Sequence, residues 1–213
     1  MKHRHTHIIL LLSAIFGIAF FVFSLMVKEK ALISFDLAAT RAIQAIIPKS
    51  SDPFFSLLSL LGSFEVMVLL LLLLLLKHKK ASSFLVLFLF GLAHAIEVVG
   101  KSFFEHSGPP LKLLRYTLPF FFPTGLLPEY AGIEGSYPSG HSLRMVFLTT
   151  IAFSLLLRSR LSKLTKTTLA LLLIAVTILM LISRISLGEH WSSDVIGGSI
   201  LGLFLGLLSI ALL

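Results

Sequence analysis

The chain has 213 residues, of which 56% are hydrophobic and 13% are charged, and it contains no cysteine. This apolar share exceeds that of soluble globular domains, so a water-soluble fold is excluded and the composition predicts a membrane protein. The lack of cysteine excludes disulfides, zinc–thiolate sites and thiol nucleophiles, and the net charge of +8 is spread among apolar runs, so no nucleic-acid partner is expected.

A helix needs about 20 apolar residues to cross the roughly 30 Å hydrocarbon core of a bilayer. None of the long apolar runs alternates with a period of two, so we expect helices rather than barrel strands. The first run is too long for the core of a signal peptide, and we expect it to be retained. The predicted fold class is all-α, a six-transmembrane-helix bundle that forms one integral membrane domain over residues 1–213. The six predicted spans are residues 8–27, 54–76, 81–100, 139–157, 164–182 and 195–213.

The basic residues predict the orientation of this bundle. With a cytoplasmic N-terminus, nine Lys and Arg residues and no acidic residue lie on the inner face, while all ten Asp and Glu residues lie in outer loops or the outer parts of helices. This asymmetry follows the positive-inside rule and predicts a multi-pass protein of the cell membrane. The nine inner residues are Lys2, Arg4, Lys77, Lys79, Lys80, Arg158, Arg160, Lys163 and Lys166.

Three stretches are then extracytoplasmic, at residues 28–53, 101–138 and 183–194. Connections of this length in a small protein are often functional or lie partly in the membrane. The apolar segment 118–123 in the middle stretch either lies in the membrane interface or packs on the bundle.

The sequence Pro138-Ser139-Gly140-His141 directly precedes the fourth predicted span. Pro and Ser favour a helix start, where the backbone N–H groups of Ser139, Gly140 and His141 would attract an anion. A histidine in that first turn could reach the bound oxyanion. A plain helix cap with an interfacial histidine is the alternative.

A second group consists of Ser183 and Arg184, then His190 after five residues and Asp194 after three more. If the last helix begins near His190, the carboxylate of Asp194 lies on the same face, where it can hold the imidazole in one tautomer. Arg184 can bind phosphate oxygens with its planar fork. Alternatively, Arg184 reaches the interface and His190 and Asp194 only cap the helix.

Lys101 ends the third span, four residues after Glu97, so it is either an ion-pair partner or a further phosphate ligand. No acidic cluster suited to Mg²⁺ or Zn²⁺ accompanies these groups. Cationic side chains would therefore have to neutralise a transferring phosphoryl group, and we expect neither a metal nor a cofactor.

These motifs resemble those of the type 2 phosphatidic acid phosphatase superfamily of integral-membrane lipid phosphatases, which is related to vanadium haloperoxidases. The family pattern is Lys-x6-Arg-Pro, then Pro-Ser-Gly-His, then Ser-Arg-x5-His-x3-Asp, and it corresponds here to residues 101–109, 138–141 and 183–194. The second and third motifs are complete.

The resemblance implies a role for each residue. His190 is the nucleophile that forms a phosphohistidine, Asp194 orients it, and His141 protonates the leaving group. The phosphate is bound by a further set: Lys101, Ser139, Gly140 and Arg184.

The first motif departs from the family because Gly108 stands where Arg is expected, although Pro109 follows as it should. One phosphate-binding cation is therefore missing from its usual place. Arg115 and Arg144 are the favoured substitutes, with Lys112 and His106 as further candidates.

The sequence therefore predicts a metal-independent lipid phosphatase with its active site on the extracytoplasmic side. Its substrate would be a phospholipid or isoprenoid phosphate, such as undecaprenyl diphosphate, phosphatidate or phosphatidylglycerophosphate, whose tail stays in the bilayer. A phosphotransferase that uses the same histidine, or a catalytically weak lipid-binding protein, are the alternatives. The motifs leave the particular lipid and the oligomeric state open.

Overall fold

The computed structural model describes residues 2–76, 82–115 and 135–212, and every regular element in these ranges is a helix. The segment 118–123 and three of the residues predicted to lie on the inner face, Lys77, Lys79 and Lys80, are outside the described residues. The eight α-helices are α1 (Lys2–Lys28), α2 (Ile33–Ile46), α3 (Asp52–Ser59), α4 (Phe64–Leu76), α5 (Ser82–Phe103), α6 (Gly140–Arg158), α7 (Lys163–Ser186) and α8 (Ser192–Leu212). Three short 3-10 helices accompany them: η1 (Lys49–Ser51), η2 (Leu60–Gly62) and η3 (Leu111–Leu113).

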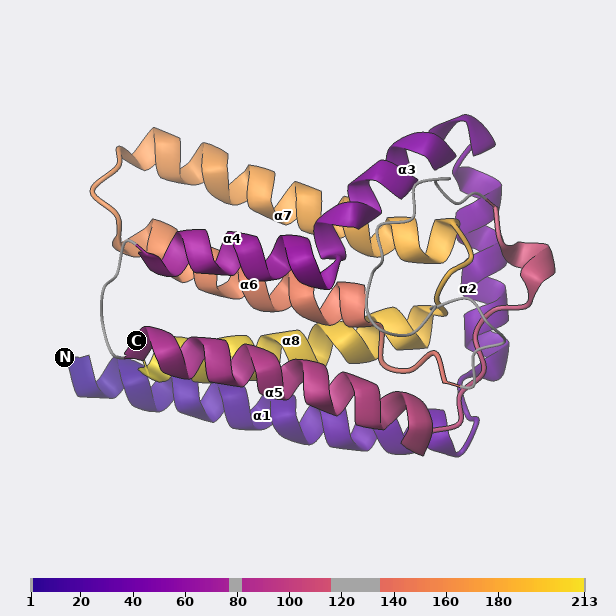
Figure 1. Ribbon diagram of the computed structural model, residues 1–213, viewed down its shortest axis with the longest axis horizontal. Coiled ribbons are helices and arrows are strands. Elements are labelled where there is room, and N and C mark those ends of the chain that lie inside the picture. Colours follow the sequence, from indigo (N-terminus) through magenta and orange to yellow (C-terminus); the bar gives the residue numbers. More distant parts are fainter. Residues whose placement is uncertain (1, 77–81, 116–134, 213) are drawn as a thin grey trace.

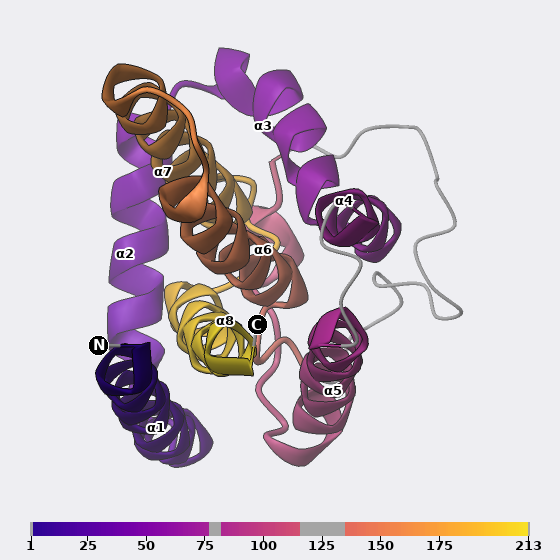
Figure 2. The same ribbon diagram turned by 90° about the vertical axis from the view of Figure 1, so that its left-hand side faces the viewer.

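Most of these helices run side by side as a bundle, and α2 lies across one end of it (Figure 1). Helix α8 is central: it lies between α1, α5 and α6 in the end-on view (Figure 2) and packs most extensively on α6 and α1. Within the described ranges, five helices are long and apolar enough to cross a membrane, and a bent pair can supply a sixth span. The predicted all-helical membrane bundle is thus confirmed.

The second span differs from the prediction of one continuous helix over residues 54–76. Here residues 49–62 and 64–76 form two helical pieces bent by 56°. The break falls at Gly62 and Ser63, where Ser63 adopts an extended backbone conformation. A break within a span frees backbone groups that need new partners. The carbonyl of Gly62 finds one in Arg144, whose Nε donates to it at 3.0 Å.

The stretch 28–53 also differs from the loop that we expected, because it contains α2. Hydrogen bonds from polar side chains near each end of α2 hold this helix to the bundle. Asp36 accepts hydrogen bonds from Ser193 at the start of α8, and Gln44 donates to the carbonyls of Leu113 and Ser186 at 2.8 and 3.0 Å. Helix α2 therefore closes one end of the bundle.

Small residues on α8 allow it to approach α6 closely. A Cβ atom at Gly202 would lie 2.5 Å from the carbonyl oxygen of Leu143, and one at Gly206 would lie 3.0 Å from Cβ of Thr150. The glycines at every fourth position of α8 therefore serve close helix packing. The apolar core beside this contact includes Leu143, Phe147, Ile151, Met180, Leu201 and Leu205.

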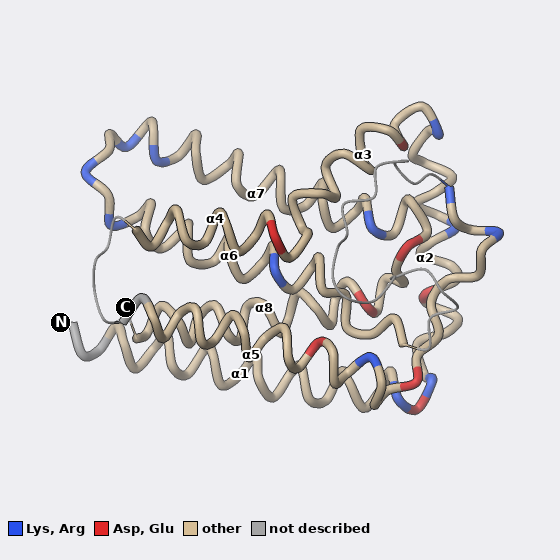
Figure 3. The backbone as a smooth tube through the Cα atoms, in the orientation of Figure 1, with Lys and Arg blue, Asp and Glu red and all other residues tan. Residues whose placement is uncertain are grey.

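Charged residues lie mainly at the two ends of the bundle (Figure 3). Among the described residues, the end where α6 and α7 are joined carries Lys and Arg without Asp or Glu, namely Arg158, Arg160, Lys163 and Lys166. The opposite end, which α2 covers, carries both signs of charge (Figure 3). This second end also holds the residues of the three motifs.

Candidate active site

The three motifs come together because four helices begin or end at the same place. Lys101 lies in the last turn of α5, and Arg184 lies in the last turn of α7. His141 lies in the first turn of α6 and Asp194 in the first turn of α8. His190 stands two residues before α8, which begins at Ser192.

The carboxylate of Asp194 lies beside the imidazole of His190. Its Oδ2 lies 3.4 Å from Nδ1 of His190, and both residues are buried. The same oxygen accepts hydrogen bonds from the backbone N–H of Trp191, at 2.9 Å, and from the hydroxyl of Ser136. An Nδ1–H group facing this carboxylate places the lone pair of the neutral imidazole on Nε2, on the other side of the ring. The contact predicted from the spacing is therefore present, although the two residues do not share a helical face.

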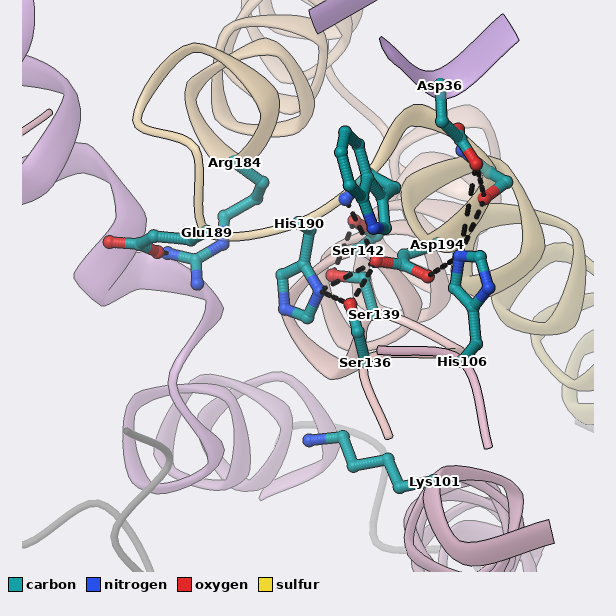
Figure 4. Close-up of polar contacts among 12 residues, drawn as sticks. Asp36, Lys101, His106, Ser136, Ser139, Ser142, Arg184, Glu189, His190 and Asp194 are labelled. Carbon is teal, nitrogen blue, oxygen red and sulfur yellow. Dashed lines mark hydrogen bonds and ion pairs between the residues drawn. The ribbon is translucent and has the colours of Figure 1, made fainter. Parts of the chain in front are cut away.

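Ser136 joins this pair from the segment ahead of α6. Its Oγ lies 3.3 Å from Nδ1 of His190 and donates to Asp194, as Figure 4 shows. Sequence reasoning missed Ser136 because a serine two residues before the second motif carries no pattern of its own.

His141 is buried at the start of α6, against the break in the second span. A Cβ atom at Gly62 would lie 2.7 Å from the ring of His141, so only glycine leaves room for this imidazole. Nδ1 of His141 has no hydrogen-bond partner within the described part of the chain. Lys101, Arg184 and His190 all lie close enough to act on the ring electrostatically. The structure therefore brings the two motif histidines and the two motif cations together.

Both motif cations face a carboxylate. Nζ of Lys101 lies 3.2 Å from Oε1 of Glu97, and the guanidinium of Arg184 forms an ion pair with Glu189 (Figure 4). The ion pair of Lys101 with Glu97 confirms the i,i+4 contact, and it does not exclude a phosphate ligand at the same ammonium group.

The first turn of α6 also faces Glu97. A Cβ atom at Gly140 would overlap the carboxylate of Glu97, so glycine is required at this position for the close approach of α5. Ser139 precedes the helix as its N-cap residue, and its hydroxyl accepts a hydrogen bond from Ser142 at 3.1 Å. Ser139 and Gly140 therefore lie where an anion at the helix N-terminus would contact them.

Gly108 marks the place of the missing arginine. A Cβ atom there would lie 3.6 Å from Cβ of Ser136, an ordinary contact, so residue 108 adjoins the hydrogen-bond partner of Asp194. The two residues before Gly108 are held by hydrogen bonds. Nε1 of Trp191 donates to the carbonyl of Ser107 at 2.9 Å, and N–H of Ser136 donates to that of His106 at 2.7 Å.

The two favoured substitutes for that arginine are engaged elsewhere. Arg115 faces Asp52, at 3.2 Å from its Nε, and both terminal nitrogens donate to the carbonyl of Ile47 at 3.0 Å. Arg115 therefore ties η3 to the connection between α2 and α3. Arg144 lies within electrostatic reach of His141, with Nη1 at 2.7 Å from Oε2 of Glu97. Phosphate binding by either arginine remains a prediction.

Within the described ranges, no group of three or more His, Asp or Glu side chains is arranged to hold a metal ion. The polar groups that converge are instead imidazoles, cations, hydroxyls and the carboxylates that face them.

Comparison with known proteins agrees with this geometry. Residues 83–213 match the family model of the PAP2 superfamily, and the chain therefore belongs to that superfamily. The fold is shared with the crystal structure of a transmembrane PAP2-type phosphatidylglycerolphosphate phosphatase from Bacillus subtilis, at a TM-score of 0.71 and 23% identity over 93% of this chain and 94% of that one. It is also shared with LpxE from Aquifex aeolicus, at a TM-score of 0.61 and 23% identity over 82% of this chain and 94% of that one. A search of the curated proteins found no match. The protein is a multi-pass membrane protein with the PAP2 fold.

The buried pair of Arg144 and Glu97 yields a stability prediction. Arg144→Met leaves the carboxylate of Glu97 and the carbonyl of Gly62 without their arginine partner. Breaking a buried pair costs about 3–5 kcal/mol, and we expect about 3 kcal/mol because Lys101 and His94 still contact Glu97. Thermal unfolding in one detergent measures the loss. The control is Arg158→Met, an exposed arginine on the same helix, and equal melting of both variants would contradict the prediction.

Proposed function

We propose that the protein is a membrane lipid phosphatase that hydrolyses a phosphomonoester or diphosphate of a lipid through a phosphohistidine at His190. The observation that carries the proposal is the buried pair of His190 and Asp194, with a second buried histidine and two cations beside it. Membership of the PAP2 superfamily supports this reading of the site.

In the first chemical step, Nε2 of neutral His190 attacks phosphorus. A P–N bond forms, the bond from phosphorus to the leaving oxygen breaks, and that oxygen takes a proton from His141. Asp194 accepts a hydrogen bond from Nδ1–H and stabilises the positive charge that develops on the ring. In the second step, His141 takes a proton from water, whose oxygen attacks phosphorus and releases phosphate and the free imidazole.

The phosphoryl oxygens would be bound by Lys101, Arg184, the hydroxyl of Ser139 and the N–H groups at the start of α6. Charge-assisted hydrogen bonds of this kind stabilise the charge on a transferring phosphoryl group. Because Glu97 and Glu189 already face the two cations, a bound phosphate must share each cation with its carboxylate or displace it. The positive charge of Lys101 and Arg184 is therefore partly neutralised by these two carboxylates before phosphate binds.

A lipid fits this site better than a soluble ester. The candidate residues lie at the ends of membrane-spanning helices, so a substrate's tail can remain in the bilayer while its head group reaches His190. The Bacillus subtilis protein of the same fold is a phosphatidylglycerolphosphate phosphatase, which makes phosphatidylglycerophosphate the first substrate to test. Phosphatidate and undecaprenyl diphosphate complete the panel.

We expect His190→Ala to lower phosphate release from the preferred lipid at least about 1,000-fold, because the nucleophile is lost. The assay measures free phosphate from each lipid in mixed detergent micelles, with EDTA present. His7→Ala, an exposed histidine of α1, is the matched control and should keep wild-type turnover. Unchanged turnover in His190→Ala would refute the mechanism, and loss of wild-type activity in EDTA would refute metal independence.

We further propose that the N-terminus is cytoplasmic and that the site faces the extracytoplasmic side. The basic end of the bundle, at the connection of α6 and α7, supports this orientation. The chain has no cysteine, so a single introduced cysteine reports on one position.

We expect a membrane-impermeant maleimide to label Lys49→Cys on intact cells and to label Arg160→Cys only after permeabilisation. Both native residues are exposed. Lys49 lies in η1, directly before α3, and Arg160 lies in the connection of α6 and α7, at the other end of the bundle (Figure 1). The reverse pattern of labelling would overturn the orientation.

A further inference from the structure

A second group of buried polar residues lies behind Asp194, on the side away from His190 (Figure 4). It consists of Asp36 from α2, His106 from the segment after α5 and Ser193 from α8. All three are buried, with Asp36 only 1% exposed. Asp36 lies outside the three motifs, and His106 and Ser193 stand at variable positions of the first and third motifs. The proposed chemistry assigns none of them a role.

Asp36 is fixed by Ser193, the residue directly before Asp194. The backbone N–H of Ser193 donates to Oδ1 of Asp36 at 2.7 Å, and its hydroxyl donates to Oδ2 at 2.7 Å. Helix α2 is thereby joined to the turn of α8 that carries Asp194.

His106 stands between the two carboxylates. Its Nε2 lies 3.6 Å from Oδ1 of Asp194 and 3.9 Å from Oδ2 of Asp36, and 3.5 Å from the hydroxyl of Ser193. Oδ1 of Asp194 has no hydrogen-bond partner in the described part of the chain, whereas Oδ2 has three polar neighbours. One oxygen of Asp194 therefore faces His190, and the other faces His106.

Two buried carboxylates that face the same imidazole repel each other and are costly to desolvate. Burial raises the pKa of Asp36, and the charge of Asp194 raises it further, against the lowering effects of Ser193 and His106. Burial also raises the pKa of Tyr137, whose ring meets that of His106 edge-on, so this phenol stays neutral. The imidazole of His106 is thus the group that can offset both negative charges.

We propose that His106, held by Asp36, is a positioning residue for the candidate nucleophile: as an imidazolium it fixes Asp194 in its ionised form, so that Asp194 can orient His190. This inference rests on the proposed function. It assigns to α2, a helix that supplies no motif residue, a part in setting the active-site charge.

The charges that face this group make the inference testable by a pH profile. His106 faces Asp36 from α2 and Asp194 from α8, while Lys101 from α5 also acts on Asp194 electrostatically. His190 must lose a proton before it can attack, so its titration forms the acidic limb of kcat/KM. Removal of a nearby positive charge makes His190 hold that proton to higher pH, and removal of a negative charge does the opposite.

The experiment uses the full-length protein in detergent and measures phosphate release from the preferred lipid between pH 5 and pH 9. For His106→Gln we expect kcat to fall about 10–100-fold with KM within about threefold, which is typical when the partner of a site residue is lost. Its acidic limb should move to higher pH by about half a unit or more. Asp36→Asn should also lower kcat, because it removes the carboxylate that holds His106 beside Asp194.

Asp52→Asn is the matched control, because Asp52 is another buried carboxylate. It lies on α3, where it pairs with Arg115. It should leave the acidic limb in place. Wild-type kcat and a wild-type pH profile in His106→Gln would overturn the inference, and so would an acidic limb that moves to lower pH in that variant. Loss of folding in both variants would assign the cluster to stability and would overturn it too. If the wild-type protein itself releases no phosphate from any lipid of the panel, the proposed function fails instead.

Discussion

The buried carboxylate of Asp194 holds together the parts of the site that come from different helices. It is fully buried and receives hydrogen bonds from Ser136 ahead of α6 and from the backbone of Trp191 ahead of α8, and it also faces His190 and His106. A buried charge is tolerated only where polar partners surround it. The segments that carry these partners must therefore lie close to Asp194. The position of His190, the candidate nucleophile, follows from that constraint.

The packing of the helices also positions the residues of the site. Glycines at 198, 202 and 206 bring α8 against α6, which places the first turns of these two helices side by side. The break at Gly62 makes room for the ring of His141, and Arg144 satisfies the carbonyl that the break exposes. A continuous second span with a larger residue at position 62 would occupy the space of that histidine. Packing and chemistry therefore depend on the same small residues.

Much of this architecture could be predicted from the sequence, because hydropathy and motif spacing are local properties. The six spans and the convergence of Lys101, His141, Arg184 and His190 at one end followed from run lengths and from motif order. The bend in the second span could not be read in this way, since residues 54–76 form one apolar run. It depends on Gly62 meeting His141 and Arg144, which are about 80 positions away in the chain.

The cluster behind Asp194 was missed for the same reason. Asp36 and Ser193 are separated by 157 positions, and a single aspartate in a charged outer stretch gives no periodic signal. The helical nature of α2 was missed as well, because its polar residues made the stretch resemble a loop. Such contacts become visible only when distant segments are placed together.

The central claim is that His190 carries the phosphoryl group during turnover, and direct detection of that group tests it best. The His141→Asn variant is incubated with an aryl phosphate, whose leaving group needs no protonation, and is quenched in alkali, in which phosphohistidine survives. Because this variant lacks the base that activates water, peptide mass spectrometry should find phosphate on His190 and nowhere else. Phosphate on another residue, or none while the aryl phosphate is still cleaved, would contradict the account.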